Sequence, residues 1–127
     1  MKILLDTHAF LSLSQDASLL GRDARDLIDR DDSRLFLSLC SVWEMAIKLK
    51  LGRLELDVSL EEAVNSGIDA GLRILELRRE AIYCTLTLDL AHRDPFDRML
   101  AAQALTEGMI FLSRDSAVDI WGVHRVW

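Results

Sequence analysis

Residues 2–6, Lys-Ile-Leu-Leu-Asp, decide the fold, because three large apolar residues that end in a charge are typical of a short strand buried on both faces. Outward from this stretch, apolar runs predict further strands at residues 35–37, 72–77, 109–112 and 123–126. Between them, helical spacing or capping signals predict helices at residues 8–13, 19–30, 41–51, 60–70, 79–86 and 95–108. This alternation predicts one α/β domain over residues 1–127, a sandwich with a parallel sheet of about five strands and helices on both faces.

Two of the predicted helices begin with recognisable signals. Ser41 and Glu44 have the spacing of a capping box, in which the serine caps the helix and the glutamate lies in its first turn. Asp94 precedes Pro95, the arrangement of an N-cap followed by a proline at the first helical position. Asp97 then falls at the third helical position, where the helix dipole favours a carboxylate.

Four acidic residues lie where their side chains can meet. Asp6 and Asp115 follow predicted strands, while Glu44 and Asp97 lie near predicted helix starts. Each could simply cap or favour a helix start, but the carboxyl ends of parallel strands share one sheet edge, where ligands bind. Two carboxylates about 5 Å apart repel by about 3 kcal/mol at an effective dielectric of about 20, so a cluster needs a cation. Oxygen ligands alone favour Mg²⁺ or Mn²⁺ over zinc, with Asp94 either an extra ligand or only a cap.

The composition limits how the chain meets partners. It has 21 acidic and 15 basic residues, a formal net charge of −6, so bulk attraction does not draw it to nucleic acid. Any RNA contact must be local, at an ion-filled acidic pocket with arginines around it. Cys40 and Cys84 match no zinc spacing and are expected to be free thiols. No stretch approaches the about 18 apolar residues of a membrane span, so we expect a cytoplasmic protein without membrane contact.

Four stretches resemble the VapC-type PIN-domain toxins of type II toxin–antitoxin pairs. They are LLDTHAFL at 4–11, SVWEMAIKLKLGRLEL at 41–56, HRDPFDRMLAAQAL at 92–105, and FLSRDSAV at 111–118 followed by VHRVW at 123–127. The resemblance spans nearly the whole chain and implies a five-stranded parallel sheet, endoribonuclease activity on RNA and a VapB-like antitoxin partner. We also expect a homodimer, and an antitoxin that covers apolar helices near residues 8–30 and 41–70.

The resemblance also implies roles for individual residues. The family's catalytic, metal-binding acids carry over to Asp6, Glu44, Asp97 and Asp115. The residues expected to support these ligands or to contact phosphate are Thr7, Arg98, Ser113 and Arg114. His8 and His92 flank acids, and we expect structural or supporting roles for them before a role as general base.

Two alternatives remain open at this point. A PIN nuclease with a housekeeping task in RNA maturation or decay would carry the same acids. A non-catalytic PIN-like module that binds RNA or protein, or a phosphoacceptor domain with an acidic Mg²⁺ pocket, is the other alternative. All four acids are intact, which argues against an inert module.

Overall fold

The computed structural model describes all of residues 1–127, and its strands form one parallel sheet in the order β3-β2-β1-β4-β5. The strands are β1 (Lys2–Leu5), β2 (Arg34–Ser38), β3 (Arg73–Leu75), β4 (Ile110–Leu112) and β5 (Arg125–Val126). The central strand β1 pairs with β2 on one side and with β4 on the other. Every pairing is parallel, so all five strands have their carboxyl ends at the same edge of the sheet. The predicted fold class is confirmed.

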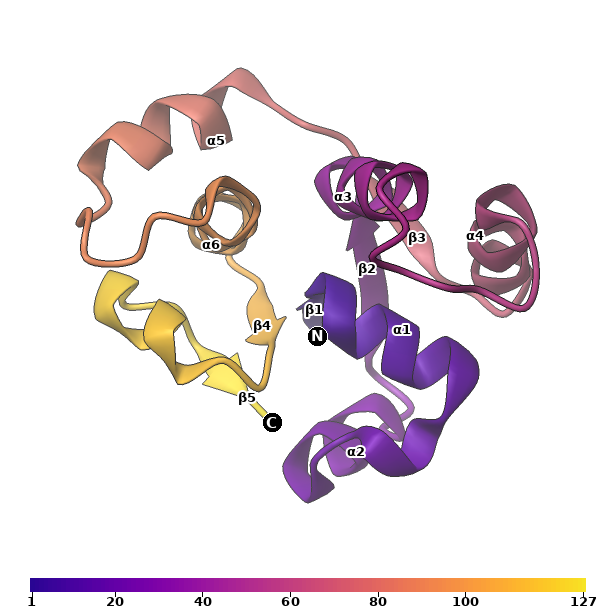
Figure 1. The fold of residues 1–127 in the computed structure, drawn as a ribbon. Helices are drawn as coiled ribbons and strands as arrows, with labels where there is room; N and C mark the ends of the chain where they lie inside the picture. The colour runs from indigo at the N-terminus through magenta and orange to yellow at the C-terminus, as the bar shows by residue number, and fades with distance from the viewer.

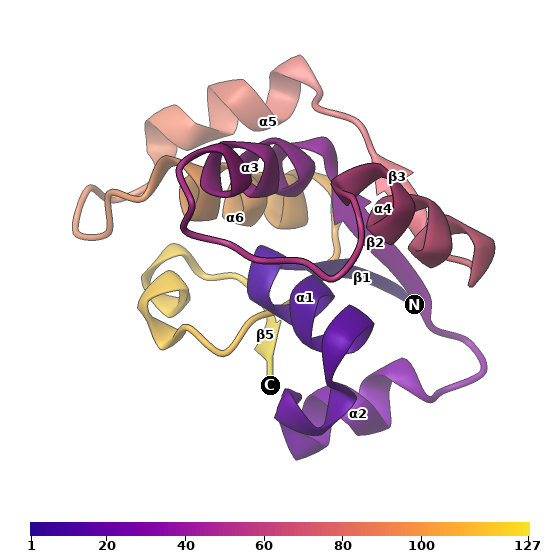
Figure 2. The same cartoon turned by 45° about the vertical axis from the view of Figure 1, so that its right-hand side comes forward.

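Helices cover both faces of this sheet (Figures 1 and 2). The helices are α1 (Thr7–Gln15), α2 (Arg22–Ile28), α3 (Leu39–Lys50), α4 (Leu60–Asp69), α5 (Arg79–Cys84) and α6 (Pro95–Glu107), with short 3-10 helices η1 (Ala17–Leu19), η2 (Thr85–Thr87) and η3 (Ser116–Trp121). In Figure 1, α5 and α6 lie on one side of the sheet, and α1, α2 and α4 lie on the other. None of the helices combines the length and apolar character that a membrane crossing requires.

The alternation of side chains along β1 explains why both faces need helices. Leu4 packs into the core beneath α5 and α6, whereas Ile3 and Leu5 pack into the core beneath α1, α2 and α4. All three side chains are fully buried, and each such burial contributes about 1.5–3 kcal/mol. This strand therefore fixes the position of Asp6, the residue that follows it.

Of the two helix starts predicted from capping signals, one is confirmed and one is wrong. The signal at Asp94 is confirmed, because its side chain accepts hydrogen bonds from the backbone amides of Phe96 and Asp97. The prediction that Ser41 opens a helix is wrong, because α3 begins two residues earlier. Ser38, the last residue of β2, caps it by accepting a hydrogen bond from the amide of Cys40. Glu44 consequently lies in the middle of α3 and not in its first turn.

Candidate active site

Two buried acids, Asp6 and Glu44, form what we call the inner pair. Asp6 follows β1 and caps α1, where its Oδ1 accepts a hydrogen bond of 2.6 Å from the amide of Ala9. The hydroxyl of Thr7 donates to Oε1 of Glu44, and Nζ of Lys48, one turn further along α3, lies 2.8 Å from Oε2. Both acids are at least nine-tenths buried. Neighbouring donors therefore hold the inner pair in place.

Three more exposed side chains form what we call the outer triad: His92, Asp97 and Asp115. Nε2 of His92 lies 2.8 Å from Oδ2 of Asp97 and 4.0 Å from Oδ2 of Asp115. Each residue of the triad offers one ligand atom, and these three atoms lie within 4.8 Å of one another. Asp97 is the third residue of α6, and Asp115 caps η3 just after β4. The carboxyl edge of the sheet thus gathers groups from distant parts of the chain.

Electrostatic coupling joins the inner pair to the outer triad. Burial raises the pKa of Asp6, the charge of Glu44 raises it further, and hydrogen bonds from Ser113 and Ala9 and the charge of His8 lower it. Burial also raises the pKa of Asp97; there the hydrogen bond and charge of His92 oppose the rise, while the charges of Asp94 and Asp6 add to it. The charge of Asp6 thus contributes to the raised pKa of Asp97, which links the inner pair to the outer triad.

The thiol of Cys40 is also affected by the negative charge of these acids. Burial and then the charges of Glu44, Asp94 and Asp97 raise its pKa to about 11. Acids from α3 and from the start of α6 thus act on one buried atom near the first turn of α3. Both cysteines are free, as predicted, with Cys40 buried and Cys84 partly buried.

Thr7 and Ser113 both contact the acids, and Arg114 adjoins one. Thr7 donates to Glu44, whereas Ser113 lies between two acids: its hydroxyl accepts a hydrogen bond from the amide of Asp115 and lowers the pKa of Asp6 by a side-chain hydrogen bond. Arg114 is exposed beside Asp115. These three residues lie where the sequence predicted support for the ligands or a contact with phosphate.

Arg98 has a different role from the phosphate contact that its neighbours suggested. Its two terminal nitrogens donate to four backbone carbonyls, those of Thr85, Leu88, Asp89 and His92, at 2.6–3.3 Å. These bonds use four of its five N–H groups, so little of the guanidinium remains for a phosphate. Arg98 therefore holds the loop between η2 and α6, and we correct its interpretation from phosphate contact to scaffold.

His92 contacts Asp97 through Nε2. It stands five residues before Asp97 in the loop that precedes α6, and its structural or supporting role stays a prediction. The sequence order His92, Asp94, Asp97 already places an imidazole close to two carboxylates at the start of a helix. Asp94 itself is exposed, and its Oδ1 is engaged with two backbone amides, which favours the role of a cap.

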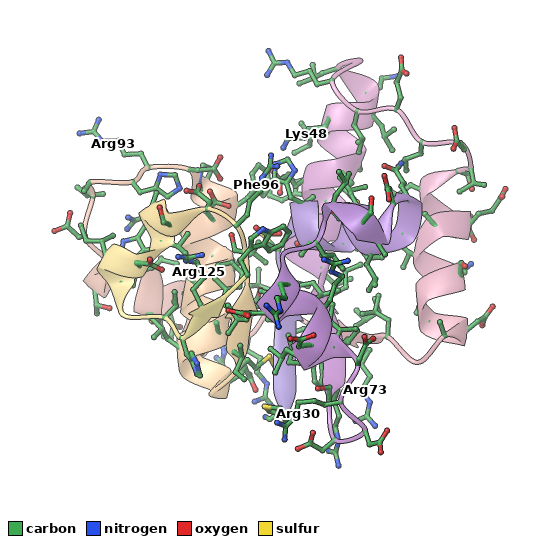
Figure 3. The ribbon with its side chains drawn as sticks, turned by 90° about the horizontal axis from the view of Figure 1, so that it is seen from below. Arg30, Lys48, Arg73, Arg93, Phe96 and Arg125 are labelled. Carbon is green, nitrogen blue, oxygen red and sulfur yellow. The ribbon has the colours of Figure 1, made fainter.

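Figure 3 shows the molecule from below with its side chains. Lys48, Phe96 and Arg93 lie at one end of the molecule, with Arg93 extending into solvent, and Arg30 and Arg73 lie at the opposite end. Arg73 begins β3, so the end that carries Lys48 and Phe96 is the end toward which the strands run. This is the edge that the sequence predicted for the acids.

The chemistry of these side chains fits a divalent cation. Ligand atoms about 2.0–2.6 Å from one ion lie about 3–5 Å apart, the range found within the outer triad. The inner pair supplies two buried carboxylates, of which Glu44 is paired with Lys48, whereas burial raises the pKa of Asp6. A cation would offset the repulsion among these groups.

Comparisons with known proteins agree with this arrangement. A profile of the PIN domain family matches residues 3–120. No curated protein matches the chain in sequence. Among solved structures, a chain of VapBC2 from Rickettsia felis bound to a DNA fragment from its promoter superimposes with a TM-score of 0.75 at 10% identity, covering 99% of this chain and 98% of that one. A chain of DNA-bound VapBC from Salmonella typhimurium gives 0.72 at 19% identity, covering 99% and 97%. A chain of VapBC-1 from nontypeable Haemophilus influenzae gives 0.69 at 15% identity, also covering 99% and 97%.

Proposed function

Because the chain belongs to the PIN domain family, we propose that it is a metal-dependent endoribonuclease and the toxin of a toxin–antitoxin pair. The observation that supports the proposal is that the ligand atoms of His92, Asp97 and Asp115 lie within 4.8 Å of one another, while the charge of the buried Asp6 contributes to the raised pKa of Asp97. The similar fold of VapBC chains supports the toxin assignment. An RNA substrate would make the cytoplasm its place of action.

In this proposal the four acids hold Mg²⁺ or Mn²⁺, and Asp94 acts as the cap that positions Asp97. Bound there, a divalent cation would stabilise the negative charge that develops on the phosphate oxygens. Thr7 and Ser113 act as positioning residues, because their hydroxyls contact Glu44 and Asp6. Arg114 is exposed next to Asp115 and is the candidate contact for an RNA phosphate. Because the net charge of the chain is −6, any attraction for RNA has to come from such local basic side chains.

The proposed reaction is hydrolysis of a phosphodiester bond. The oxygen of a water bonds to phosphorus, the bond from phosphorus to the 3′-oxygen breaks, and the products carry a 5′-phosphate and a 3′-hydroxyl. Asp6 or Glu44 orients that water and accepts its proton.

The proposed antitoxin would bind an apolar groove on the face that carries α1 and α4. The groove has a volume of about 820 Å³, and 10 of its 16 lining residues are hydrophobic, among them Leu13, Leu56 and Val58. Asp57 and Glu62 also line it. We therefore expect an antitoxin segment with an apolar stripe flanked by basic side chains. Of the 16 lining residues, all but Leu35 and Leu72 belong to the regions at residues 8–30 and 41–70 that the sequence suggested for this partner.

A second copy of the chain would cover a different surface. Trp43 on α3, Tyr83 on α5 and Leu86 on η2 are 64%, 61% and 86% exposed, which is unusual for such large apolar side chains. The helices α3 and α5 lie on the same side of the molecule in Figures 1 and 2. We propose this side as the homodimer interface, which measurement of the mass in solution would test.

The nuclease proposal is tested by cleavage of a mixed RNA pool with Mg²⁺, Mn²⁺ or EDTA. We expect the wild type to cut RNA with either metal and not with EDTA. Asp6→Asn should cleave RNA at least about a hundredfold more slowly, because the loss of even a hydrogen-bond partner of a metal ligand lowers activity by about 10–100-fold. Its circular dichroism spectrum should match that of the wild type. Asp31→Asn, the same change at an exposed position far along the chain, should cut like the wild type. Equal cutting by Asp6→Asn would remove Asp6 from the mechanism, and cutting in EDTA would end the metal proposal.

Growth separates the toxin from a housekeeping nuclease. Expression of the wild type should arrest growth, Asp6→Asn should not, and co-expression of a small DNA-binding protein encoded beside this gene should restore growth. Unimpaired growth with active wild-type enzyme would favour the housekeeping alternative.

A further inference from the structure

We propose that His92 is itself a ligand of the metal centre and that its nitrogen gives the centre a preference for Mn²⁺ over Mg²⁺. This inference rests on the proposed function, because it concerns the same cation. It goes beyond the four carboxylates, which by themselves do not separate the two metals. The observation behind it is that Nε2 of His92 is one of three ligand atoms gathered within 4.8 Å.

The surroundings of His92 hold its ring in one orientation. The ring packs against Trp121 with centroids 5.4 Å apart, and the indole of Trp121 in turn donates to the carbonyl of Asp89 at 3.0 Å. Arg98 donates to the carbonyl of His92 and lies over the indole, 5.6 Å from its centroid. Backbone and ring are thus fixed by separate contacts, and Nε2 faces the two aspartates.

The spacing of the three atoms is that of a shared ion. Nε2 is 2.8 Å from Oδ2 of Asp97 and 4.0 Å from Oδ2 of Asp115. Two ligands at right angles, each about 2.1 Å from an ion, lie about 3 Å apart, and two opposite ligands lie about 4.2 Å apart. A cation can therefore replace the hydrogen bond between His92 and Asp97 with little movement of the ring.

The nitrogen matters for the choice of metal. Both ions suit carboxylate ligands, but Mg²⁺ demands near-ideal octahedral oxygen geometry and gives up its waters reluctantly, whereas Mn²⁺, a transition-metal ion, exchanges a water for an imidazole nitrogen more readily. A site of carboxylates alone would hold both ions by charge, but a nitrogen ligand contributes more to Mn²⁺. His92 should therefore raise affinity for Mn²⁺ selectively.

The test measures binding and not activity. Titration calorimetry with Mn²⁺ and with Mg²⁺ gives the ratio of the two affinities for the wild type, His92→Gln and His124→Gln. Glutamine can still donate a hydrogen bond to Asp97, so His92→Gln removes the imidazole while retaining that contact. His124 is exposed and serves as the matched control. We expect His92→Gln to lower the preference for Mn²⁺ by about tenfold, and His124→Gln to leave it unchanged.

A spectroscopic measurement keeps the test independent of the variant's folding. Pulsed electron paramagnetic resonance of Mn²⁺ bound to the wild type should show coupling to an imidazole nitrogen, and labelling of histidine with ¹⁵N should alter that signal. Bound Mn²⁺ without nitrogen coupling, or an unchanged metal preference in a folded His92→Gln, would overturn the inference and leave the nuclease proposal standing. Failure of the wild type to bind either metal would overturn both.

Discussion

The inner pair and the outer triad carry the same kind of chemistry in different surroundings. Asp6 and Glu44 are nearly buried, and their oxygens already accept hydrogen bonds from Ala9 and Thr7. In the outer triad, by contrast, the side chains of Asp97 and Asp115 are 27% and 49% exposed. We infer that the two groups have different roles in the proposed site. The inner pair supplies a fixed negative charge, and the outer triad forms the open side where a substrate can reach a cation.

The two halves are also stabilised differently. The inner pair depends on residues next to it on α1 and α3, so the helices themselves fix its geometry. In the outer triad, His92 lies in the loop between η2 and α6, and the side chain of Arg98 donates hydrogen bonds to four carbonyls of η2 and this loop. Changes that loosen each half should therefore have distinguishable consequences.

The largest effect is expected from Arg98→Met, which tests the support of the outer triad. The change leaves four carbonyls without their charged donor and should cost about 2–4 kcal/mol of unfolding free energy. The loop at residues 85–92 should exchange its amide hydrogens faster, and Mn²⁺ affinity should fall, because the backbone of His92 is no longer held. Denaturant unfolding, hydrogen exchange and titration calorimetry with Mn²⁺ measure the three consequences.

Arg79→Met is the control for this prediction, since it removes an exposed arginine at the start of α5. It should change stability by less than about 0.5 kcal/mol. If Arg98→Met instead weakened RNA binding while stability and exchange at residues 85–92 stayed as in the wild type, the phosphate contact would be the better of the two roles that the sequence allowed for Arg98.

The fold was accessible from the sequence because its signals are local. The run at 2–6 predicts a strand buried on both faces, and Asp94-Pro95 predicts a helix start. Neither prediction needs information about residues far away in the chain. The capping box at Ser41 failed because Ser38 supplies the same chemistry three residues earlier and directly ends β2, which lets α3 begin sooner. Two serines near one helix start compete, and the spacing alone does not choose between them.

The support of the site was not accessible, because it depends on contacts between distant residues. That Glu44 pairs with Thr7 across 37 positions has no trace in local spacing. Arg98 adjoins Asp97 in sequence, but its side chain leaves that acid and turns to carbonyls of residues 85–92. The four acids themselves could be selected from their places after strands and near helix starts, and the family resemblance implied their roles.

A smaller effect is expected from Thr7→Val, which tests the support of the inner pair. Valine keeps the shape of threonine and removes the hydroxyl, so Oε1 of the buried Glu44 loses its donor. A buried acceptor left unpaired costs about 1–3 kcal/mol, and Lys48 on the other oxygen should hold the loss to the lower end of that range. Thermal unfolding measures it, with Thr7→Ser as the control that retains the hydroxyl. Equal losses in both variants would show that packing of the methyl group, and not the hydrogen bond, matters at this position.

The smallest effect is expected from Asp97→Asn, and its sign should depend on metal. Folding raises the pKa of Asp97 above its ordinary value of 3.8, so the folded chain binds a proton at higher pH than the unfolded chain. The metal-free protein therefore loses stability as the pH rises through that interval, and the full penalty is present at neutral pH. Asparagine removes this penalty, which should raise the metal-free melting temperature by a few degrees, or less than about 1 kcal/mol, and flatten its dependence on pH above about pH 4.

Adding Mn²⁺ should reverse the order of the two proteins. The wild type gains stability from an ion that binds only its folded state, and Asp97→Asn gains less because it has lost a ligand. Asp31→Asn, an exposed position, should follow the wild type with and without metal. A metal-free Asp97→Asn that melts below the wild type would mean that the attraction between Asp97 and the first turn of α6 outweighs its repulsion from Asp6 and Asp94, so that the outer triad would be stable without a cation.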